Sequence, residues 1–160
     1  MAVQLSADVV WQAIEKELFA VLGMVTAAGE ARTVGIVYIV RDRKLYIATG
    51  ADTWKARHVS ANPHVSLTVP IAKRIPFLPW IKIPQATITF CGTARIIPPA
   101  EASPEIVAAI FRGAANDKEL LAQSCLIEVT PVGEFIIYGV GISLGQMRQP
   151  ELARGRAPVA

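Results

Sequence analysis

Residues 44–69 limit the fold more than any other part of the chain. The stretch Leu45–Thr49 is apolar and rich in β-branched or aromatic residues, which is typical of a strand. Thr53 follows as a suitable N-cap, because its hydroxyl can accept a backbone N–H of the first helical turn. Pro63 ends that helix after about two and a half turns, and a second strand begins there. We therefore expect a strand, a short helix and a strand in close succession.

The same segment collects groups that can hold a phosphate. Thr49 and Thr53 supply hydroxyls, and free backbone N–H groups at a helix N-terminus favour an anion. Lys55 supplies a point charge and Arg57 a forked guanidinium. The alternative is that Lys55 and Arg57 form only the solvated basic face of a short helix.

Similar apolar stretches recur along the chain and predict a mainly β protein. Strands are expected over Phe19–Ala27, Thr33–Val40, Leu45–Thr49, His64–Ile71, Gln85–Ile97, Cys125–Thr130 and Glu134–Val140. The short links between the first three predict an antiparallel meander. The last two are expected to form a hairpin across residues 131–133.

Helices are expected at the periphery. Ser6 caps one over residues 6–17, and its apolar face is expected to plug one end of a barrel. Ser103 caps a second, over residues 103–113, with a proline at its first position. A third covers residues 117–123.

The composition is that of a folded globular domain. The 160 residues are enough for a core, and 52% hydrophobic against 18% charged residues argues against disorder. No apolar run approaches the roughly 18–20 residues that span a bilayer. Asp8 and Glu15 lie where a signal peptide has its apolar core, so we expect a cytoplasmic protein without a membrane span.

Charge and cysteine usage limit the possible partners and metal sites. The net charge is +3, but the positive residues are scattered and no RNA-binding signature is present, so nucleic acid is not expected as a partner. A phosphorylated small ligand suits this excess equally well. Cys91 and Cys125 form no close-spaced motif and have only His58 and His64 beside them. We therefore expect two buried thiols and no metal site.

Residues 72–84 form an irregular stretch. Three prolines rule out a helix or a central strand there, namely Pro76, Pro79 and Pro84. Large apolar residues lie among them, namely Phe77, Leu78 and Trp80. The stretch is a pocket wall or dimer contact, a segment packed on its own domain, or a membrane-surface contact. The flanking cations that suit the last alternative are Lys73, Arg74 and Lys82.

A spacing pattern links the central segment to a known family. The pattern T-x(3)-[ST]-x-K…N-P-x-V resembles that of the pyridoxamine 5'-phosphate oxidase-like family, and the residues that match it are Thr49, Thr53, Lys55, Asn62, Pro63 and Val65. The resemblance covers roughly residues 19–139. It implies an FMN-binding split β-barrel, mainly β with peripheral helices and six to seven antiparallel strands. We expect one domain over residues 1–142 and a tail over residues 143–160.

The resemblance also implies a ligand and an assembly. FMN is the expected cofactor, the deazaflavin coenzyme F-420 is the alternative, and haem comes third because only His58 and His64 are obvious axial ligands. A homodimer with the cofactor at the subunit interface is expected, together with a small-molecule substrate. The arginine-containing tail either is disordered or folds over the cofactor site of the partner subunit. A cofactor-binding protein without turnover stays the alternative to an oxidoreductase.

Further site residues follow from the resemblance alone. The strand beside the flavin ring maps onto Gly35, Ile36, Val37 and Tyr38, although Gly35 is also consistent with a bulge. Thr87 stands where several relatives carry a flavin-contacting glutamine. Gln85 lies two residues away on the same strand face and is assigned the contact instead. No nucleophile–base pair or paired carboxylates are found, so the catalytic residues stay unassigned. The W-x-G…R-x-[HD]-R substrate motif is missing after Val140, which argues against vitamin B6 oxidation.

Overall fold

The computed structural model describes residues 3–78 and 80–160, so Pro79 of the predicted irregular stretch lies outside the described residues. The strands are β1 (Val3–Gln4), β2 (Phe19–Val25), β3 (Ala31–Val37), β4 (Ile39–Arg41), β5 (Lys44–Gly50), β6 (His64–Ile71), β7 (Ala86–Ile97), β8 (Ser124–Tyr138) and β9 (Arg154–Pro158). The helices are α1 (Ala7–Lys16), α2 (Trp54–Ala61), α3 (Pro104–Phe111), α4 (Lys118–Ala122) and α5 (Pro150–Ala153). Short 3₁₀ helices lie at Pro99–Glu101, Arg112–Ala114 and Gln146–Arg148.

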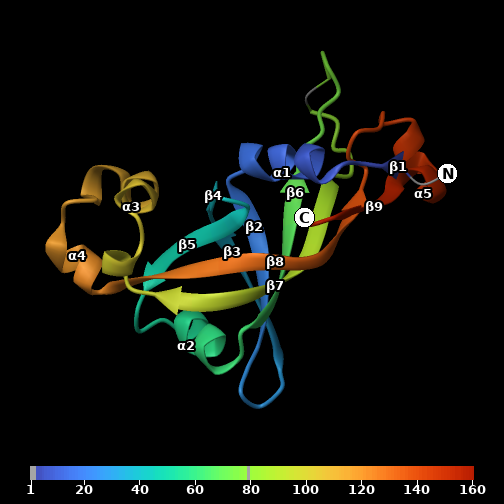
Figure 1. Cartoon of the computed structure of the whole chain (residues 1–160). Coiled ribbons are helices and arrows are strands. Elements are labelled where there is room, and N and C mark those ends of the chain that lie inside the picture. Colours follow the sequence, from blue (N-terminus) through green and yellow to red (C-terminus); the bar gives the residue numbers. More distant parts are fainter. Residues whose placement is uncertain (1–2, 79) are drawn as a thin grey trace.

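The strands form one curled sheet (Figure 1). The order along it is β1, β9, β8, β7, β6, β2 and β3, while β5 pairs with both β8 and β4. The chain passes from β3 to β4 at Tyr38, so one half of this stretch pairs with β2 and the other with β5. Apart from the short parallel pair of β1 and β9, the pairs are antiparallel. The predicted mainly β split barrel with peripheral helices is confirmed.

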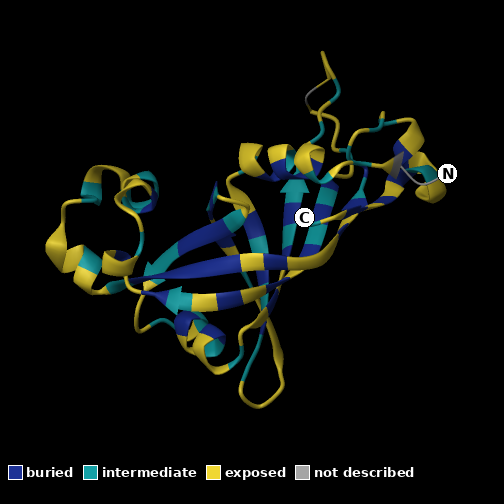
Figure 2. Cartoon of the chain, in the orientation of Figure 1, coloured by how far each residue is buried: buried dark blue, intermediate teal, exposed yellow. Residues whose placement is uncertain are grey.

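The main hydrophobic core lies inside the curled sheet, and α1 covers one end of it (Figure 2). Val10 and Ile14 of α1 are fully buried in this core. The ring of Trp11 packs edge-on against Phe135, with the ring centroids 5.4 Å apart. Its indole Nε1 also donates to the carbonyl oxygen of Val159 at 3.0 Å. The prediction that the first helix plugs the barrel is therefore confirmed.

A second, smaller core lies between α3 and the strands. Tyr46 of β5, Ile97 of β7 and Leu126 of β8 pack there with Ile106 of α3. Successive residues of a strand point to opposite faces of the sheet, so these strands serve the barrel interior and this outer core at once. Ser103 caps α3 as predicted, since its Oγ accepts the N–H of Ile106 at 3.4 Å.

The predicted hairpin over residues 125–140 is wrong. β8 runs from Ser124 to Tyr138 without reversing and pairs with β7 along most of its length. The expected turn is a bulge, in which residues 133–135 of β8 lie opposite Phe90 alone. Gly133 has φ +77, so the chain accommodates the extra residues without leaving the sheet. Turns and bulges use the same residue types, and the long partner strand β7 decides between them.

Three smaller expectations also need correction. The single strand predicted over residues 33–40 divides at Tyr38, because its halves pair with different strands. Gln85 lies just before β7 rather than within it. Cys91 is exposed, whereas Cys125 is buried, because Cys91 lies on the outward face of β7.

Within residues 143–160, one strand joins the sheet of its own chain. β9 pairs antiparallel with residues 134–138 of β8, and α5 comes directly before it. Contact of this segment with a partner subunit stays a prediction. None of the helices in the described part of the chain has the length and apolar character needed to cross a bilayer.

Candidate cofactor-binding site

A local network of hydroxyl groups builds the start of α2. Thr53 caps the helix, and its Oγ1 accepts the N–H of Ala56 at 3.4 Å. The same hydroxyl donates to the carbonyl oxygen of Gly50 at 2.9 Å. Because this uses the single hydroxyl proton of Thr53, the proton in its 3.0 Å contact with Thr49 comes from Thr49. The two threonines therefore shape the helix start rather than offer free donors.

Lys55 is the cation at this helix end that lacks a protein partner. Its side chain is half-buried, and within residues 3–78 and 80–160 no hydrogen bond or ion pair engages its ammonium group. Burial raises the pKa of the Cys125 thiol at the start of β8, and the positive charge of Lys55 opposes that rise. A half-buried cation without a counter-ion favours an anionic ligand.

Arg57 lies on another side of α2. It is exposed, and its Nη2 donates to the carbonyl oxygen of Asp52 at 2.8 Å, which places the guanidinium over the loop before the helix. Trp54 and His58 pack edge-to-face one turn apart, with their ring centroids 5.6 Å apart. The two predicted cations thus share the helix end, and the charge of Lys55 acts on Cys125 at the start of β8.

Gly35 and Val37 lie on the exposed side of β3, the last strand in the sheet order. Gly35 pairs with β2 in a regular register, so the alternative of a bulge there is wrong. A Cβ at Gly35 would lie 2.8 Å from the ring of Phe19, so the glycine makes room for that ring on the neighbouring strand β2. Val37 is 65% exposed and offers apolar surface next to it.

Ile36 and Tyr38 turn their side chains into the core. The hydroxyl of Tyr38 donates to the carbonyl oxygen of Ile14 at 2.7 Å. Burial, with a smaller contribution from Glu17, raises the pKa of Tyr38 far above its usual value. These side chains are structural, and the backbone N–H of Tyr38 also donates within the fold, to the carbonyl oxygen of Leu18 at 3.2 Å.

A pocket of about 270 Å³ joins β3, β5 and α3. Val37, Tyr38 and Ala48 line it, and Arg112 adds a cation. Ala48 directly precedes Thr49, so β5 connects this pocket to the start of α2. The volume is below the roughly 300–1,000 Å³ of most ligand sites.

Gln85 lies away from this region within one chain. It is exposed just before β7, whereas β7 approaches α2 at Ala94, whose N–H donates to the carbonyl oxygen of Pro63 at 2.8 Å. Nine residues of extended chain separate Gln85 from Ala94, which corresponds to about 30 Å. The flavin contact assigned to Gln85 stays a prediction.

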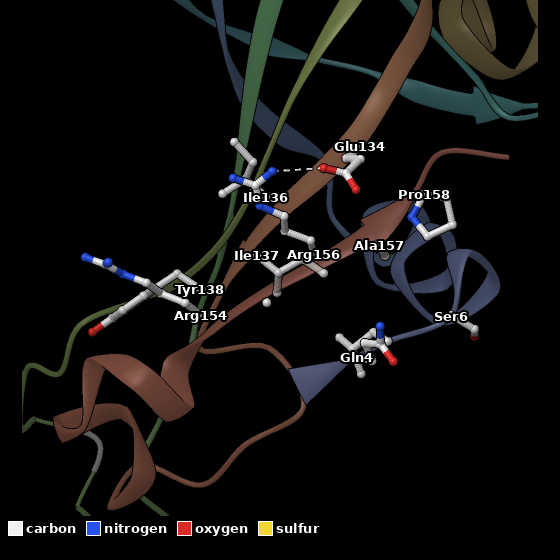
Figure 3. A pocket seen from close by; sticks show the side chains of 12 residues that line it. Gln4, Ser6, Glu134, Ile136, Ile137, Tyr138, Arg154, Arg156, Ala157 and Pro158 are labelled. Carbon is white, nitrogen blue, oxygen red and sulfur yellow. Dashed lines mark hydrogen bonds and ion pairs between the residues drawn. The ribbon is translucent and has the colours of Figure 1, made fainter. Parts of the chain in front are cut away.

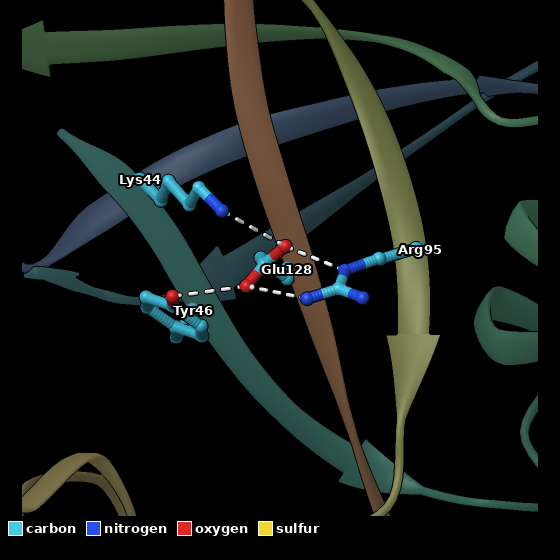
Figure 4. A network of polar contacts seen from close by, with 4 residues as sticks. All are labelled: Lys44, Tyr46, Arg95 and Glu128. Carbon is cyan, nitrogen blue, oxygen red and sulfur yellow. Dashed lines mark hydrogen bonds and ion pairs between the residues drawn. The ribbon is translucent and has the colours of Figure 1, made fainter. Parts of the chain in front are cut away.

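A buried carboxylate network was not foreseen from the sequence (Figure 4). Glu128 of β8 is 5% exposed and lies between Tyr46 of β5 and Arg95 of β7. Arg95 donates twice, at 2.6 Å to Oε1 and 3.3 Å to Oε2. The hydroxyl of Tyr46 donates to Oε2 at 3.0 Å, and Lys44 Nζ lies 3.4 Å from Oε1.

The network keeps Glu128 ionised. The hydrogen bond from Arg95 lowers the pKa of Glu128 in spite of burial, which acts in the opposite direction. Burial, aided by the hydrogen bond to Glu128, raises the pKa of Tyr46 to about 12. A lone acid within an apolar strand was the available sequence signal. Its partners come from strands distant in sequence, which no local pattern identifies.

A pocket of about 840 Å³ lies at the end of β8 that is distant from α2 (Figure 3). Tyr138 of β8, Arg154 and Arg156 of β9 and residues 4–6 line it. Arg156 Nη1 donates to the carboxylate of Glu134 at 3.0 Å. The lining includes none of the predicted site residues, so this pocket is separate from the start of α2.

The described residues contain no group of three or more His, Cys, Asp or Glu side chains that could hold a metal ion. His64 is exposed on β6, and His58 packs against Trp54.

A sequence model of one protein family, described as pyridoxamine 5'-phosphate oxidase, matches residues 7–136. This is most of the chain. Among curated protein sequences, none matches significantly.

Solved structures share the fold at low sequence identity. A FAD-binding protein from Mesorhizobium loti is 16% identical with a TM-score of 0.61, over 79% of this chain and 90% of that one. A structure named F420 reductase is 21% identical with a TM-score of 0.53, over 78% and 93%. HutZ, the haem storage protein from Vibrio cholerae, is 13% identical with a TM-score of 0.63, over 84% and 96%. At these identities the similarity concerns the fold alone.

Proposed function

The chain belongs to the pyridoxamine 5'-phosphate oxidase family, and from this premise we propose that it is an FMN-dependent oxidoreductase. Its reaction is hydride transfer to or from a small molecule. The missing substrate motif after Val140 favours a substrate other than a vitamin B6 compound.

The observation that carries the proposal is the half-buried ammonium of Lys55, which has no partner in the described part of the chain. A phosphate at the start of α2 would satisfy this charge. Arg57 and the N–H groups of the first helical turn can add donors from the same end of the helix. Thr49 and Thr53 hold this helix end in position through their hydroxyl contacts. The residues present therefore fit the phosphate of FMN.

In the proposed complex, the ring of FMN lies beside β3. The exposed Val37 offers apolar surface to a planar ligand. The backbone groups of Ile36 and Tyr38 pair with β2. Those of Gly35 and Val37 therefore lie on the outer edge of β3, and they face the polar edge of the ring. A bound flavin supplies the hydride chemistry, while the protein binds and orients it and excludes water. None of the residues named is assigned a catalytic role.

A second copy of the chain completes the proposed site. The pocket of about 270 Å³ beside Val37 is small for a whole cofactor. Gln85 is about 30 Å along β7 from the part that meets α2, so its predicted contact is made with the cofactor of the partner subunit. We thus propose a homodimer with the cofactor at the subunit interface.

The alternative cofactor is the deazaflavin coenzyme F-420. The fold similarity to a structure named F420 reductase favours it, and the chemistry of Lys55 suits either phosphorylated ligand. A flavin carrier without turnover would use the same residues.

The visible absorption spectrum of the purified protein tests the proposal, before and after addition of FMN or F-420 and removal of the excess. A retained two-band flavin spectrum supports the FMN proposal, and a retained single deazaflavin band replaces it with the alternative. A Soret band, or no retained chromophore with either cofactor, contradicts both. Reduction and reoxidation of the retained cofactor in stopped-flow traces separates an enzyme from a carrier.

A further inference from the structure

An exposed apolar loop joins β6 to β7. It covers residues 72–85 and projects beyond the end of the sheet that α1 covers (Figure 1). Phe77 is 94% exposed and Trp80 is 72% exposed, and Leu78 and Ile81 are exposed as well. Single exposed apolar residues are common, but four of them on one projecting loop mark an interaction site.

Two backbone hydrogen bonds link described residues near the tip of this loop. The carbonyl oxygen of Ile75 accepts the N–H of Leu78, and the carbonyl oxygen of Leu78 accepts the N–H of Ile81, both at 3.2 Å. Phe77 has φ +67, which a bulky residue rarely adopts, yet its ring gains no burial from it.

Positive charge surrounds the base of the loop. Arg74 and Lys82 are exposed on its two arms, and Arg148 lies beside Lys82 in the lining of one pocket of about 630 Å³. Lys73 Nζ donates to the carbonyl oxygen of Ile142, which ties one arm to the same region. The sequence contains no Asp or Glu between Asp52 and Glu101, so no acid of this segment offsets these charges.

We propose that this loop docks the protein on an anionic phospholipid surface. Phe77 and Trp80 insert into the boundary between headgroups and acyl chains, where aromatic side chains are favoured. Arg74, Lys82 and Arg148 contact the phosphates from the base of the loop. The same loop of a second copy is a poorer occupant of the tip, because a contact between the two loops would bring cations of the same sign together. The inference concerns surface contact rather than a span, and it uses the tip of the loop and its cations, while Gln85 at the end of the loop belongs to the proposed subunit interface.

Vesicle co-sedimentation of the purified full-length chain tests the proposal. Vesicles of phosphatidylcholine alone are compared with vesicles that also contain phosphatidylserine, at low and high salt. We expect binding to the anionic vesicles that weakens with salt. The double variant Phe77→Ser/Trp80→Ser should lower the partition coefficient about tenfold or more. The matched control Leu120→Ser/Val132→Ser removes two exposed apolar side chains elsewhere and should bind like the wild type.

The charges are tested separately from the apolar tip. Arg74→Gln/Lys82→Gln should lower the partition coefficient on anionic vesicles about fivefold for each cation removed. Trp80 emission should shift to the blue on anionic vesicles and be quenched by brominated lipid. The variant Trp80→Phe should keep binding and lose this signal, which identifies the inserted side chain.

Other results overturn the proposal. The proposal is wrong if the wild type does not bind anionic vesicles. It is also wrong if the wild type and Phe77→Ser/Trp80→Ser bind them equally. If the same variant instead converts a dimer to a monomer in analytical ultracentrifugation without vesicles, the loop is a subunit contact. Thermal unfolding of each variant without lipid confirms that it is folded.

Discussion

Glu128 and Arg95 face each other across the pairing of β7 with β8, and Arg95 Nε donates to Glu128 Oε1 at 2.6 Å. The carboxylate is nearly buried, whereas the Arg95 side chain is mostly exposed. Tyr46 approaches from β5, the strand on the other side of β8. The carboxylate of Glu128 therefore joins three neighbouring strands of the barrel wall. Such a group stabilises the fold only while it is ionised and fully hydrogen-bonded.

Replacement of this acid should make the stability less sensitive to acid pH. Because the pKa of Glu128 in the folded protein is below its ordinary value of 4.5, its stabilising effect is present above that value and lost as the pH falls through the lowered one. Glu128→Gln should lower the free energy of unfolding at neutral pH by about 1–3 kcal/mol. The loss of stability between pH 6 and pH 3 should be smaller than in the wild type.

Urea unfolding as a function of pH measures both effects. Glu134→Gln is the matched control, because its ion pair with Arg156 is exposed and should contribute about 1 kcal/mol or less. If Glu128→Gln and Glu134→Gln changed the free energy of unfolding equally, the buried network of Glu128 would contribute no more to stability than an exposed ion pair.

Removal of the ammonium of Lys55 should weaken cofactor binding. We expect Lys55→Ala to reduce the affinity for FMN by about 1.5–3 kcal/mol, as for hydrogen bonds to charged groups. Fluorescence titration measures the dissociation constant. Lys118→Ala removes an exposed lysine at the start of α4 and should leave it unchanged. An unchanged constant for Lys55→Ala would remove the assigned phosphate site.

The substitution Gly35→Ala should affect FMN binding more than it affects the stability of the fold. The added Cβ would lie 2.8 Å from the ring of Phe19, a half-exposed side chain that can move aside, so stability should change by about 1 kcal/mol or less. If a flavin ring lies beside this strand, FMN affinity falls by about 1–3 kcal/mol. Calorimetric titration of Gly35→Ala and the control Gly113→Ala, where a Cβ meets nothing within 4 Å, measures the difference. Equal affinities would place the ring elsewhere.

The hydroxyl of Tyr38 should matter for stability and not for the cofactor. Tyr38→Phe removes its hydrogen bond to Ile14 and should cost about 0.5–1.5 kcal/mol at neutral pH. The raised pKa of Tyr38 means that the unfolded chain ionises first as the pH rises above 10.0, so the wild type loses stability there. The variant should lose less over the same range in thermal unfolding. A large rise in the FMN dissociation constant would instead assign the side chain to the site.

Local features were predictable from the sequence because they depend on neighbouring residues. Ser6, Thr53 and Ser103 each cap the helix that was expected to follow, since a cap needs only a side-chain oxygen and the next turn of the chain. The match of Thr53 and Lys55 to a spacing pattern likewise led to the family, and thereby to the mainly β split barrel.

Only the tertiary structure decided which strands pair and which charges meet. The residue types of Pro131 and Gly133 suggest a turn. However, β7 is long enough to pair with β8 on both sides of these residues, so β8 is one strand with a bulge. The partners of Glu128 and the place of β9 beside β8 depend on contacts between distant parts of the chain. The sequence by itself thus determined the elements and their caps, because short-range sterics and hydrogen bonds act within a few residues. Pairing and register were decided by burial over the whole barrel, which no short segment contains.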